Sequence, residues 1–240
     1  MSRHSKWSKV KQFKGAIDAK RSASFTKLSR EITVAVKEKG ADPSFNVRLR
    51  VAIDRAKKGL MPKEVIQRAI DRATGAGGEA QLEQLLYEAY APGGTALMIE
   101  CVTDNRNRSV ATVKHLLSKK NGTMAGTGSV AYLFDRVGTV HVPDPLPAER
   151  HDDIELALID AGATDIIEDE NGVDIRTTPS NLMAVADAVA KCALTVESAE
   201  FEWIPKTTVE TDEATGLAVE ELVSELESDD DVSRVYSNLA

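Results

Sequence analysis

The 240-residue chain contains only two cysteines, Cys101 and Cys192. Two cysteines cannot build a disulfide framework, and so few indicate a reducing compartment. The longest apolar run, residues 95–102, is interrupted by Glu100, whereas a helix that spans a bilayer needs roughly 20 apolar residues. Residues 1–7 contain no apolar segment of the kind that marks a secretory signal. We therefore expect a soluble, cytoplasmic protein with no membrane partner.

The chain also lacks the motifs that mark common catalytic and cofactor sites. Neither G-x-x-x-x-G-K-[ST] nor G-x-S-x-G occurs, and the histidines and cysteines show no C-x-x-C or H-x-x-x-H spacing. Two G-x-G-x-x-A stretches begin at Gly75 and Gly126, but neither lies between a strand and a helix, and we interpret both as turns. Acidic pairs such as Asp152-Asp153 are interpreted as solvated faces. The sequence therefore predicts no enzyme activity, no cofactor, no metal and no small-molecule substrate.

Charge is distributed very unevenly along the chain. Residues 1–72 carry 19 Lys and Arg against 7 Asp and Glu, residues 73–140 carry 6 against 6, and residues 141–240 carry 5 against 25. A basic segment followed by an acidic one indicates a polyanionic partner that is bound by the basic segment. The alternative, that these are merely solvated faces, does not explain so complete a segregation.

Hydrophobic periodicity predicts helices throughout the basic segment. One helix is expected to end at Gly59, because glycine tolerates the left-handed conformation that follows a helix, and the next is expected to begin at Pro62. These two helices resemble a helix-turn-helix, although a plain helical hairpin is the simpler interpretation. Glycines at 75–78 form a linker that ends the region.

The rest of the chain reads as two α+β domains. Residues 137–204 follow the strand–helix–strand–strand–helix–strand order of a ferredoxin-like domain, with a type I′ turn at Asn171-Gly172 and a helix capped by Ser180. Residues 129–134 are predicted as one strand, and the segments after residue 205 are expected to return and complete the middle sheet. The predicted domains are 1–78, all helical and basic; 79–136 plus 205–240, α+β; and 137–204, acidic, ferredoxin-like and inserted in the second.

The basic segment has the features of a nucleic-acid-binding surface. Residues 1–30 hold nine Lys and Arg against one acid, Asp18. Trp7 and Phe13 lie among these cations, which suits phosphate contact combined with stacking on a base. Phe13 is assigned instead to the helical core, and for Trp7 both interpretations stay open. The predicted nucleic-acid-binding residues here are Arg3, His4, Lys6, Trp7, Lys9, Lys11, Lys14, Lys20, Arg21 and Lys27.

Two further arginines lie where a cation is electrostatically unfavourable. Arg106 and Arg108 are predicted just inside the N-terminus of a helix over residues 106–120, where the helix dipole is positive. A phosphate bound there would gain the free N–H groups and both guanidinium groups. Alternatively, Asp104 pairs with the two arginines and removes the cost. We add Arg106 and Arg108 to the predicted nucleic-acid-binding residues.

Ordered motifs along essentially the whole chain resemble the YebC/PmpR family. Arg3 stands where the family usually has glycine, and Ala89 and Ala91 replace glycines around Tyr90; these differences leave the polyanion interpretation intact. The matching motifs are His4-Ser5-Lys6-Trp7, Phe25-Thr26-Lys27-Leu28, Asp42-Pro43 with Asn46-x-Arg48-Leu49-Arg50, Met61-Pro62-Lys63, Tyr87-Glu88-x-Tyr90-x-Pro92-Gly93-Gly94, residues 103–108, and Gly128-Ser129-Val130-Ala131-Tyr132.

The resemblance implies a helical bundle followed by two α+β domains, the third inserted in the second, and no enzyme activity. It implies a regulator of transcription that binds DNA. Relatives, including a mitochondrial translational activator of a cytochrome oxidase subunit, act instead in translation on the ribosome. Both roles use a polyanion, so DNA and ribosomal RNA both remain open as partners, and the sequence leaves the oligomeric state open as well.

Overall fold

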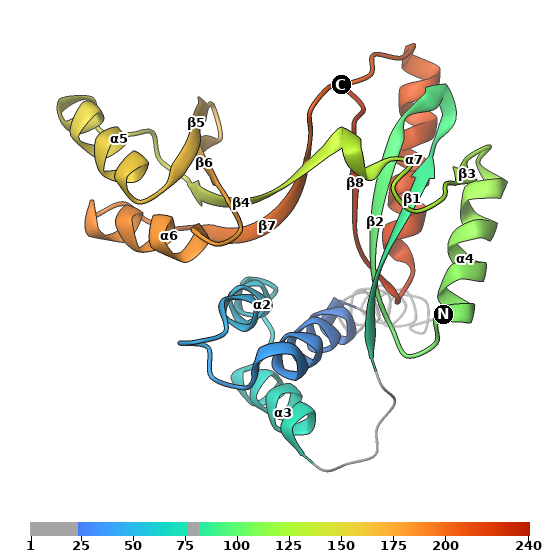
Figure 1. Cartoon of the computed structure of the whole chain (residues 1–240), viewed down its shortest axis with the longest axis horizontal. Helices are drawn as coiled ribbons and strands as arrows, with labels where there is room; N and C mark the ends of the chain where they lie inside the picture. Colours follow the sequence, from blue (N-terminus) through green and yellow to red (C-terminus); the bar gives the residue numbers. More distant parts are fainter. Residues whose placement is uncertain (1–23, 76–81) are drawn as a thin grey trace, which may run out of the picture. The chain divides into compact units, whose positions relative to one another are not determined.

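The computed structural model of the chain describes residues 24–75 and 82–240 (Figure 1). Residues 24–39 form the first described helix. No helix within these described ranges is both long enough and apolar enough to cross a membrane. The elements that follow are α2 (Val47–Lys58), α3 (Lys63–Thr74), β1 (Glu83–Tyr90), η1 (Pro92–Gly94), β2 (Ala96–Thr103), α4 (Arg106–Lys119), β3 (Thr123–Met124), η2 (Ala131–Leu133), β4 (Phe134–Val142), η3 (Ala148–Arg150), α5 (His151–Asp160), β5 (Ala163–Asp169), β6 (Gly172–Thr177), α6 (Leu182–Lys191), β7 (Ser198–Pro205), α7 (Glu213–Ser228) and β8 (Val232–Ser237).

The chain divides into two compact units. One unit holds the described residues up to Leu86 together with Glu100–Val113 and Ser224–Arg234, and the other holds Tyr87–Ile99, Lys114–Val223 and Val235–Ala240. The multidomain class predicted from the sequence, helical first and α+β afterwards, is confirmed. The three domain boundaries drawn above stay a prediction.

The helical region is held together by apolar side chains and one buried asparagine. Asn46 is fully buried; its Oδ1 accepts the N–H of Leu49 at 3.0 Å, and its Nδ2 donates to the carbonyl oxygens of Ala35 at 2.7 Å and Gly40 at 2.8 Å. This amide therefore begins α2 and ties it to the preceding helix. The core of the region consists of Leu28, Ile32, Ala35, Val36, Leu49, Ala52, Ala56, Met61, Ile66, Ala69 and Ile70.

The left-handed residue after α2 is Leu60 rather than Gly59, so this detail of the sequence prediction is wrong. Gly59 has a φ of −68°, whereas Leu60 has a φ of 59°. The N–H of Met61 bonds to the carbonyl oxygen of Ala56 and that of Leu60 to Lys57, both at 2.9 Å. These are the two hydrogen bonds of a Schellman motif with Leu60 at the left-handed position, where a Cβ is unfavourable.

We expect Leu60→Gly to raise the free energy of unfolding by about 1 kcal/mol, because glycine adopts positive φ without steric cost. Leu60 is 71% exposed, so the substitution removes little packing. Urea denaturation measures the change. Leu60→Ala is the matched control: it removes the same atoms beyond Cβ but keeps the Cβ, and should give no comparable gain. Equal stabilisation by both substitutions would contradict the backbone explanation.

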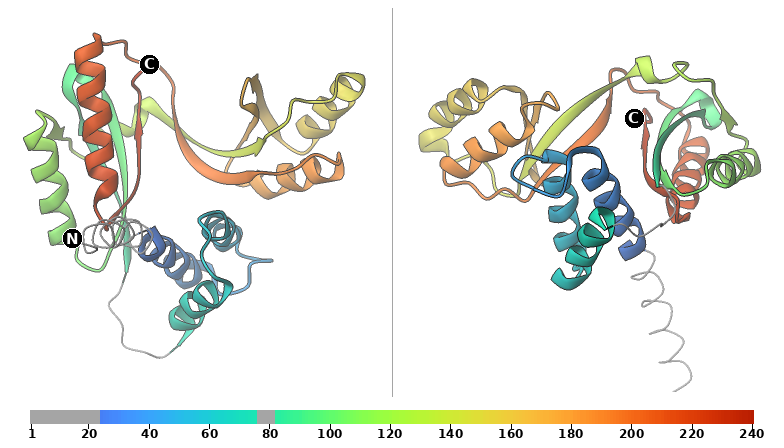
Figure 2. Two further views of the ribbon diagram at one scale, coloured as in Figure 1. Left: turned by 180° about the vertical axis from the view of Figure 1, so that it is seen from behind. Right: turned by 60° about the horizontal axis from the view of Figure 1, so that its bottom comes forward.

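The first sheet has the strand order β3-β1-β2-β8. β1 and β2 are joined through Gly93 and Gly94, whose φ values of 73° and 76° only glycine adopts readily. Figure 2 shows α4 and α7 side by side on one face of this sheet. The expected return of the C-terminal segment is confirmed, because β8 pairs with β2.

The predicted strand over residues 129–134 is wrong. Residues 126–129 form an exposed loop, the buried Val130 leads into η2, and β4 begins only at Phe134. The physical reason is Glu88 on β1, whose carboxylate accepts the N–H groups of Gly128, Val130 and Ala131. Those N–H groups are therefore not available to a strand ladder. The second G-x-G-x-x-A stretch thus lies in a loop that is followed by a strand, outside any dinucleotide-binding context.

The second sheet confirms the ferredoxin-like prediction. Its order is β5-β6-β4-β7, and β4 pairs antiparallel with both β6 and β7, as the split βαβ arrangement requires. β4 and β7 also pair where the chain enters and leaves the domain, from Phe134 opposite Pro205 onward.

Two local predictions in this domain are wrong. Only Gly172 of the β5–β6 turn has a positive φ, of 132°, whereas a type I′ turn requires positive φ at Asn171 also. Helix α6 begins after Asn181, because the Ser180 hydroxyl is 2.9 Å from that of Thr178 and does not cap the helix.

Candidate nucleic-acid interface

The structure tests the surroundings of only three predicted nucleic-acid-binding residues: Lys27, Arg106 and Arg108. The nucleic-acid role of all of them stays a prediction. The other residues of that set lie outside the described residues: Arg3, His4, Lys6, Trp7, Lys9, Lys11, Lys14, Lys20 and Arg21.

Lys27 is a half-buried cation on the first described helix. Its Nζ donates a hydrogen bond to the carbonyl oxygen of Glu227 at 2.5 Å. Burial lowers the pKa of Lys27, and the nearby carboxylates of Asp229, Asp230 and Glu227 oppose that shift. The ammonium group is therefore already engaged by residues at the end of α7.

Arg108 belongs to a cluster around one buried carboxylate, that of Asp231, whose side chain is 6% exposed. The Nη2 of Arg108 lies 3.0 and 2.8 Å from the two carboxylate oxygens of Asp231, and the Nε of Arg108 lies 3.2 Å from one of them. Arg30 Nη1 donates to Asp231 at 2.7 Å, and the Thr103 hydroxyl donates at 2.9 Å. Two guanidinium groups and one hydroxyl thus satisfy a charge that would be costly to bury alone.

The alternative in which Asp104 neutralises the arginines is confirmed for Arg108 and not for Arg106. Arg108 Nη2 lies 2.7 Å from Asp104 Oδ1, and the two hydrogen-bonded carboxylates of Asp231 and Asp104 raise the pKa of Arg108. Arg106 is exposed and makes no ion pair within the described part of the chain. Asn105 caps α4 through a 3.0 Å bond to the N–H of Arg108.

The two arginines should therefore differ in their effect on stability. Arg108→Ala leaves Asp231 with Arg30 as its remaining cation, and we expect a loss of about 1–2 kcal/mol in the free energy of unfolding. Arg106→Ala removes a cation from the positive end of a helix dipole and should be neutral or slightly stabilising. Urea denaturation of the two single variants measures both changes, and equal effects would contradict this assignment.

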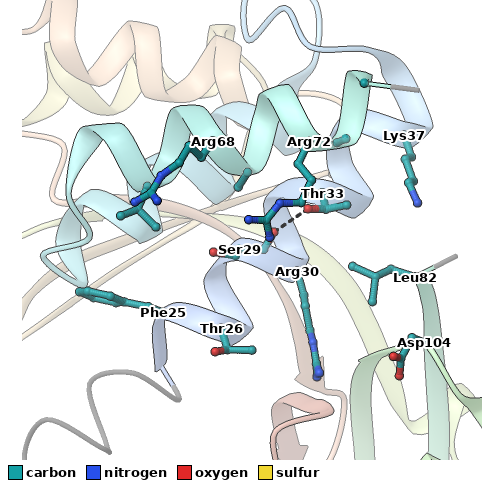
Figure 3. Close-up of a pocket in the computed structure, with 14 residues that line it drawn as sticks. Phe25, Thr26, Ser29, Arg30, Thr33, Lys37, Arg68, Arg72, Leu82 and Asp104 are labelled. Carbon is teal, nitrogen blue, oxygen red and sulfur yellow. Dashed lines mark hydrogen bonds between the residues drawn. The ribbon is translucent and has the colours of Figure 1, made fainter. Parts of the chain in front are cut away.

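A groove of about 550 Å³ lies between the first described helix and α3 (Figure 3). Four cations line it, namely Arg30, Lys37, Arg68 and Arg72, against one acid, Asp104. Hydroxyl groups of Thr26, Ser29 and Thr33 line the same helix face. The remaining lining residues are Phe25, Val65, Ala69, Ala73, Gly75 and Leu82.

The groove residues were not among the predicted site residues, although the sequence holds a signal for them. Ser29, Thr33 and Lys37 recur four residues apart, and so do Arg68 and Arg72. Residues four apart lie on one face of a helix, so each set forms a polar stripe. The pattern could have predicted two stripes but not that they face each other across one groove.

A second organised feature joins two of the sequence motifs. Glu88, which is 5% exposed, accepts N–H groups at 2.6 Å from Gly128, 2.5 Å from Val130 and 2.8 Å from Ala131. The hydroxyl of Tyr90 donates to the carbonyl oxygen of Ser129 at 2.9 Å. Burial raises the pKa of Glu88, but the three N–H groups more than offset this, so its pKa lies below the usual value.

The described ranges contain few other groups that could bind a metal or react. His151, Asp152 and Glu155 place their ligand atoms within 4.8 Å of one another and could hold a metal. The other ring nitrogen of His151 already lies 2.8 Å from Glu168. Burial raises the pKa of the Cys101 thiol to about 12, which keeps it protonated at neutral pH.

The fold and the groove together define the class of protein. It is a multidomain α and α+β protein whose basic helical region contains a groove lined by cations. Residues 5–76 match the family described as "TACO1/YebC protein N-terminal domain", and residues 82–239 match "TACO1/YebC second and third domain". The chain belongs to the TACO1/YebC family.

Relatives agree with this membership. A protein named "Probable transcriptional regulatory protein" from Rubrobacter xylanophilus is 46% identical over 239 residues, which cover 99% of this chain and 95% of the relative. A protein of the same name from Thermosipho melanesiensis is 45% identical over 238 residues, covering 99% and 93%. The crystal structure of a conserved hypothetical protein from Aquifex aeolicus superimposes with a TM-score of 0.81 at 40% identity, covering 93% of this chain and 92% of that one.

Proposed function

We propose that the protein is a non-enzymatic regulator that binds nucleic acid through its helical region. The observation that carries this proposal is the groove lined by Arg30, Lys37, Arg68 and Arg72, within a segment where cations outnumber acids by 19 to 7. The sequence before residue 24 holds seven further Lys and Arg. A phosphate backbone is the polyanion that such a surface attracts most strongly.

The groove chemistry suits contacts to phosphates. Arginine guanidinium groups present paired donors that match phosphate oxygens, and Lys37 adds a mobile point charge. The hydroxyl of Ser29 lies on the same face, whereas that of Thr33 already donates to the carbonyl oxygen of Ser29 at 2.9 Å. Contacts of this kind fix the position of the protein on a nucleic acid but do not distinguish one base from another.

DNA is the first candidate partner, because curated relatives carry the name of a transcriptional regulatory protein. A second candidate, a translation factor that binds ribosomal RNA, is favoured by the groove itself. Arg68 and Arg72 extend from α3 into a concave surface, whereas readout in the major groove requires a helix that enters it. A concave cationic groove suits a single strand or the backbone of folded RNA.

The test compares binding of the full chain to a DNA duplex of about 30 base pairs and to a structured RNA of similar size over a salt series. If about five phosphates are neutralised, log affinity should fall against log salt with a slope of roughly −4 to −5. Co-sedimentation with ribosomes at moderate salt distinguishes the second candidate from the first. An affinity that does not change with salt would contradict the proposal.

A further inference from the structure

The turn between α7 and β8 is strongly acidic and contacts the first described helix, residues 24–39. We define the acidic turn as residues 227–231, Glu-Ser-Asp-Asp-Asp. Lys27 donates to the carbonyl oxygen of Glu227 at 2.5 Å. Arg30 donates to the carbonyl oxygen of Asp230 at 2.8 Å and to the carboxylate of Asp231 at 2.7 Å. Lys27 and Arg30 therefore both contact a five-residue segment that carries four acidic side chains.

Within the groove, the cations are not equivalent. Arg30 lines it but is held by the acidic turn, and Asp104 lines the same groove. Lys37 and Arg68 lie beyond these contacts: neither makes an ion pair with a described residue, and Arg68 uses only its Nε, toward the carbonyl oxygen of Glu64. The positive charge of Arg30 is consequently compensated, whereas the charges of Lys37 and Arg68 are not paired with a carboxylate of the described residues.

We propose that the acidic turn competes with nucleic acid for Lys27 and Arg30, so that a bound phosphate backbone is held in the groove by Lys37 and Arg68, which have no carboxylate partner among the described residues. The inference rests on the proposed function and adds the regulation of that site. Carboxylates within a few ångströms of a cation reduce its attraction for phosphate directly, and they repel phosphates over roughly 8 Å at physiological salt. The turn thus limits both affinity and the number of phosphates contacted.

The test removes the charge of the turn and keeps its shape. The turn variant is Glu227→Gln, Asp229→Asn and Asp230→Asn; asparagine at 229 retains an oxygen for the N–H of Asp231, which Asp229 now accepts at 2.9 Å. Asp231 stays, because it also binds Arg108 and Thr103. The matched control is Asp152→Asn, Asp153→Asn and Glu155→Gln on α5, which changes the net charge equally. Thermal unfolding confirms that both are folded.

We expect the turn variant to bind the DNA duplex or the structured RNA about fivefold more tightly than the control variant, with a salt slope steeper by about one unit for each phosphate gained. Lys27→Gln supplies the second measurement. It should lower affinity less than about twofold in the wild-type chain, where the lysine is occupied, and should remove most of the gain in the turn variant.

Equal affinities of the turn and control variants would overturn the inference while leaving the proposed function standing. So would a Lys27→Gln effect that is the same in both backgrounds, because the lysine would then be equally available with and without the acidic turn. A wild-type chain that binds neither probe would overturn the proposed function and the inference with it.

Discussion

Reversing the charge of Lys37 and Arg68 is expected to lower affinity for nucleic acid by roughly 100-fold, because two phosphate contacts in the groove are replaced by two repulsions. Both side chains are exposed, so the free energy of unfolding should change by less than about 0.5 kcal/mol. Fluorescence anisotropy with labelled duplex and RNA measures Lys37→Glu/Arg68→Glu, and urea denaturation measures its stability.

The matched control for this variant is Lys39→Glu/Lys63→Glu. Both lysines are exposed, belong to the same helical region and lie outside the groove lining. The net charge changes by the same amount, so general electrostatic attraction weakens equally in the two variants. A loss in the control as large as that in the groove variant would show that the groove has no special role, and a groove variant with wild-type affinity would place binding elsewhere.

Replacing Glu88 is expected to have the largest effect on stability. Glu88→Ala leaves the N–H groups of Gly128, Val130 and Ala131 without their acceptor, in a position where Glu88 itself is 5% exposed. Hydrogen bonds to a charged group contribute about 1.5–3 kcal/mol each and are not additive, so we expect a loss of about 3–5 kcal/mol in the free energy of unfolding, measured by urea denaturation.

The same carboxylate predicts a dependence on pH. Because the pKa of Glu88 is lowered in the folded chain, its stabilising contribution is fully present above the unfolded value of about 4.3 and is lost as pH falls through the lower folded value. The decline of stability between about pH 5 and pH 3 should therefore be shallower in Glu88→Gln than in the wild type.

Glu83, an exposed glutamate on the same strand, provides the control for Glu88. Glu83→Gln should leave both the stability and its pH profile unchanged within about 0.5 kcal/mol. A loss below about 1 kcal/mol in Glu88→Ala would mean that the loop finds other acceptors and that Glu88 does not hold it.

Local signals in the sequence were sufficient for most of the elements. Pro62 predicts the start of α3, and hydrophobic periodicity predicts the helices of the basic segment. The order of strands and helices within residues 137–204 predicts the ferredoxin-like sheet, which the strand order confirms. These features depend on neighbours a few residues apart, so their physical causes are visible in the sequence itself.

Where the sequence prediction is wrong, hydrogen bonds decide the local conformation. Residues 129–134 have the composition of a strand, but the carboxylate of Glu88, about 40 residues earlier, accepts the N–H groups of Val130 and Ala131. Left-handed φ falls on Leu60 although glycine precedes it, because the helix continues one residue further than composition suggests. In both cases hydrogen bonding outweighs the preference of the single residue.

The sequence by itself determined that the chain has a basic helical beginning and an acidic α+β end, and that a polyanion is the partner to expect. Tertiary structure decided which cations are available. Arg108 and Asp231 are 123 positions apart and Lys27 and Glu227 are 200 apart, yet they are bonded. Lys37 and Arg68 instead face a groove. Charge can be counted along a chain, but its compensation depends on distances in space, because the Coulomb energy of a pair falls with separation and with exposure to water.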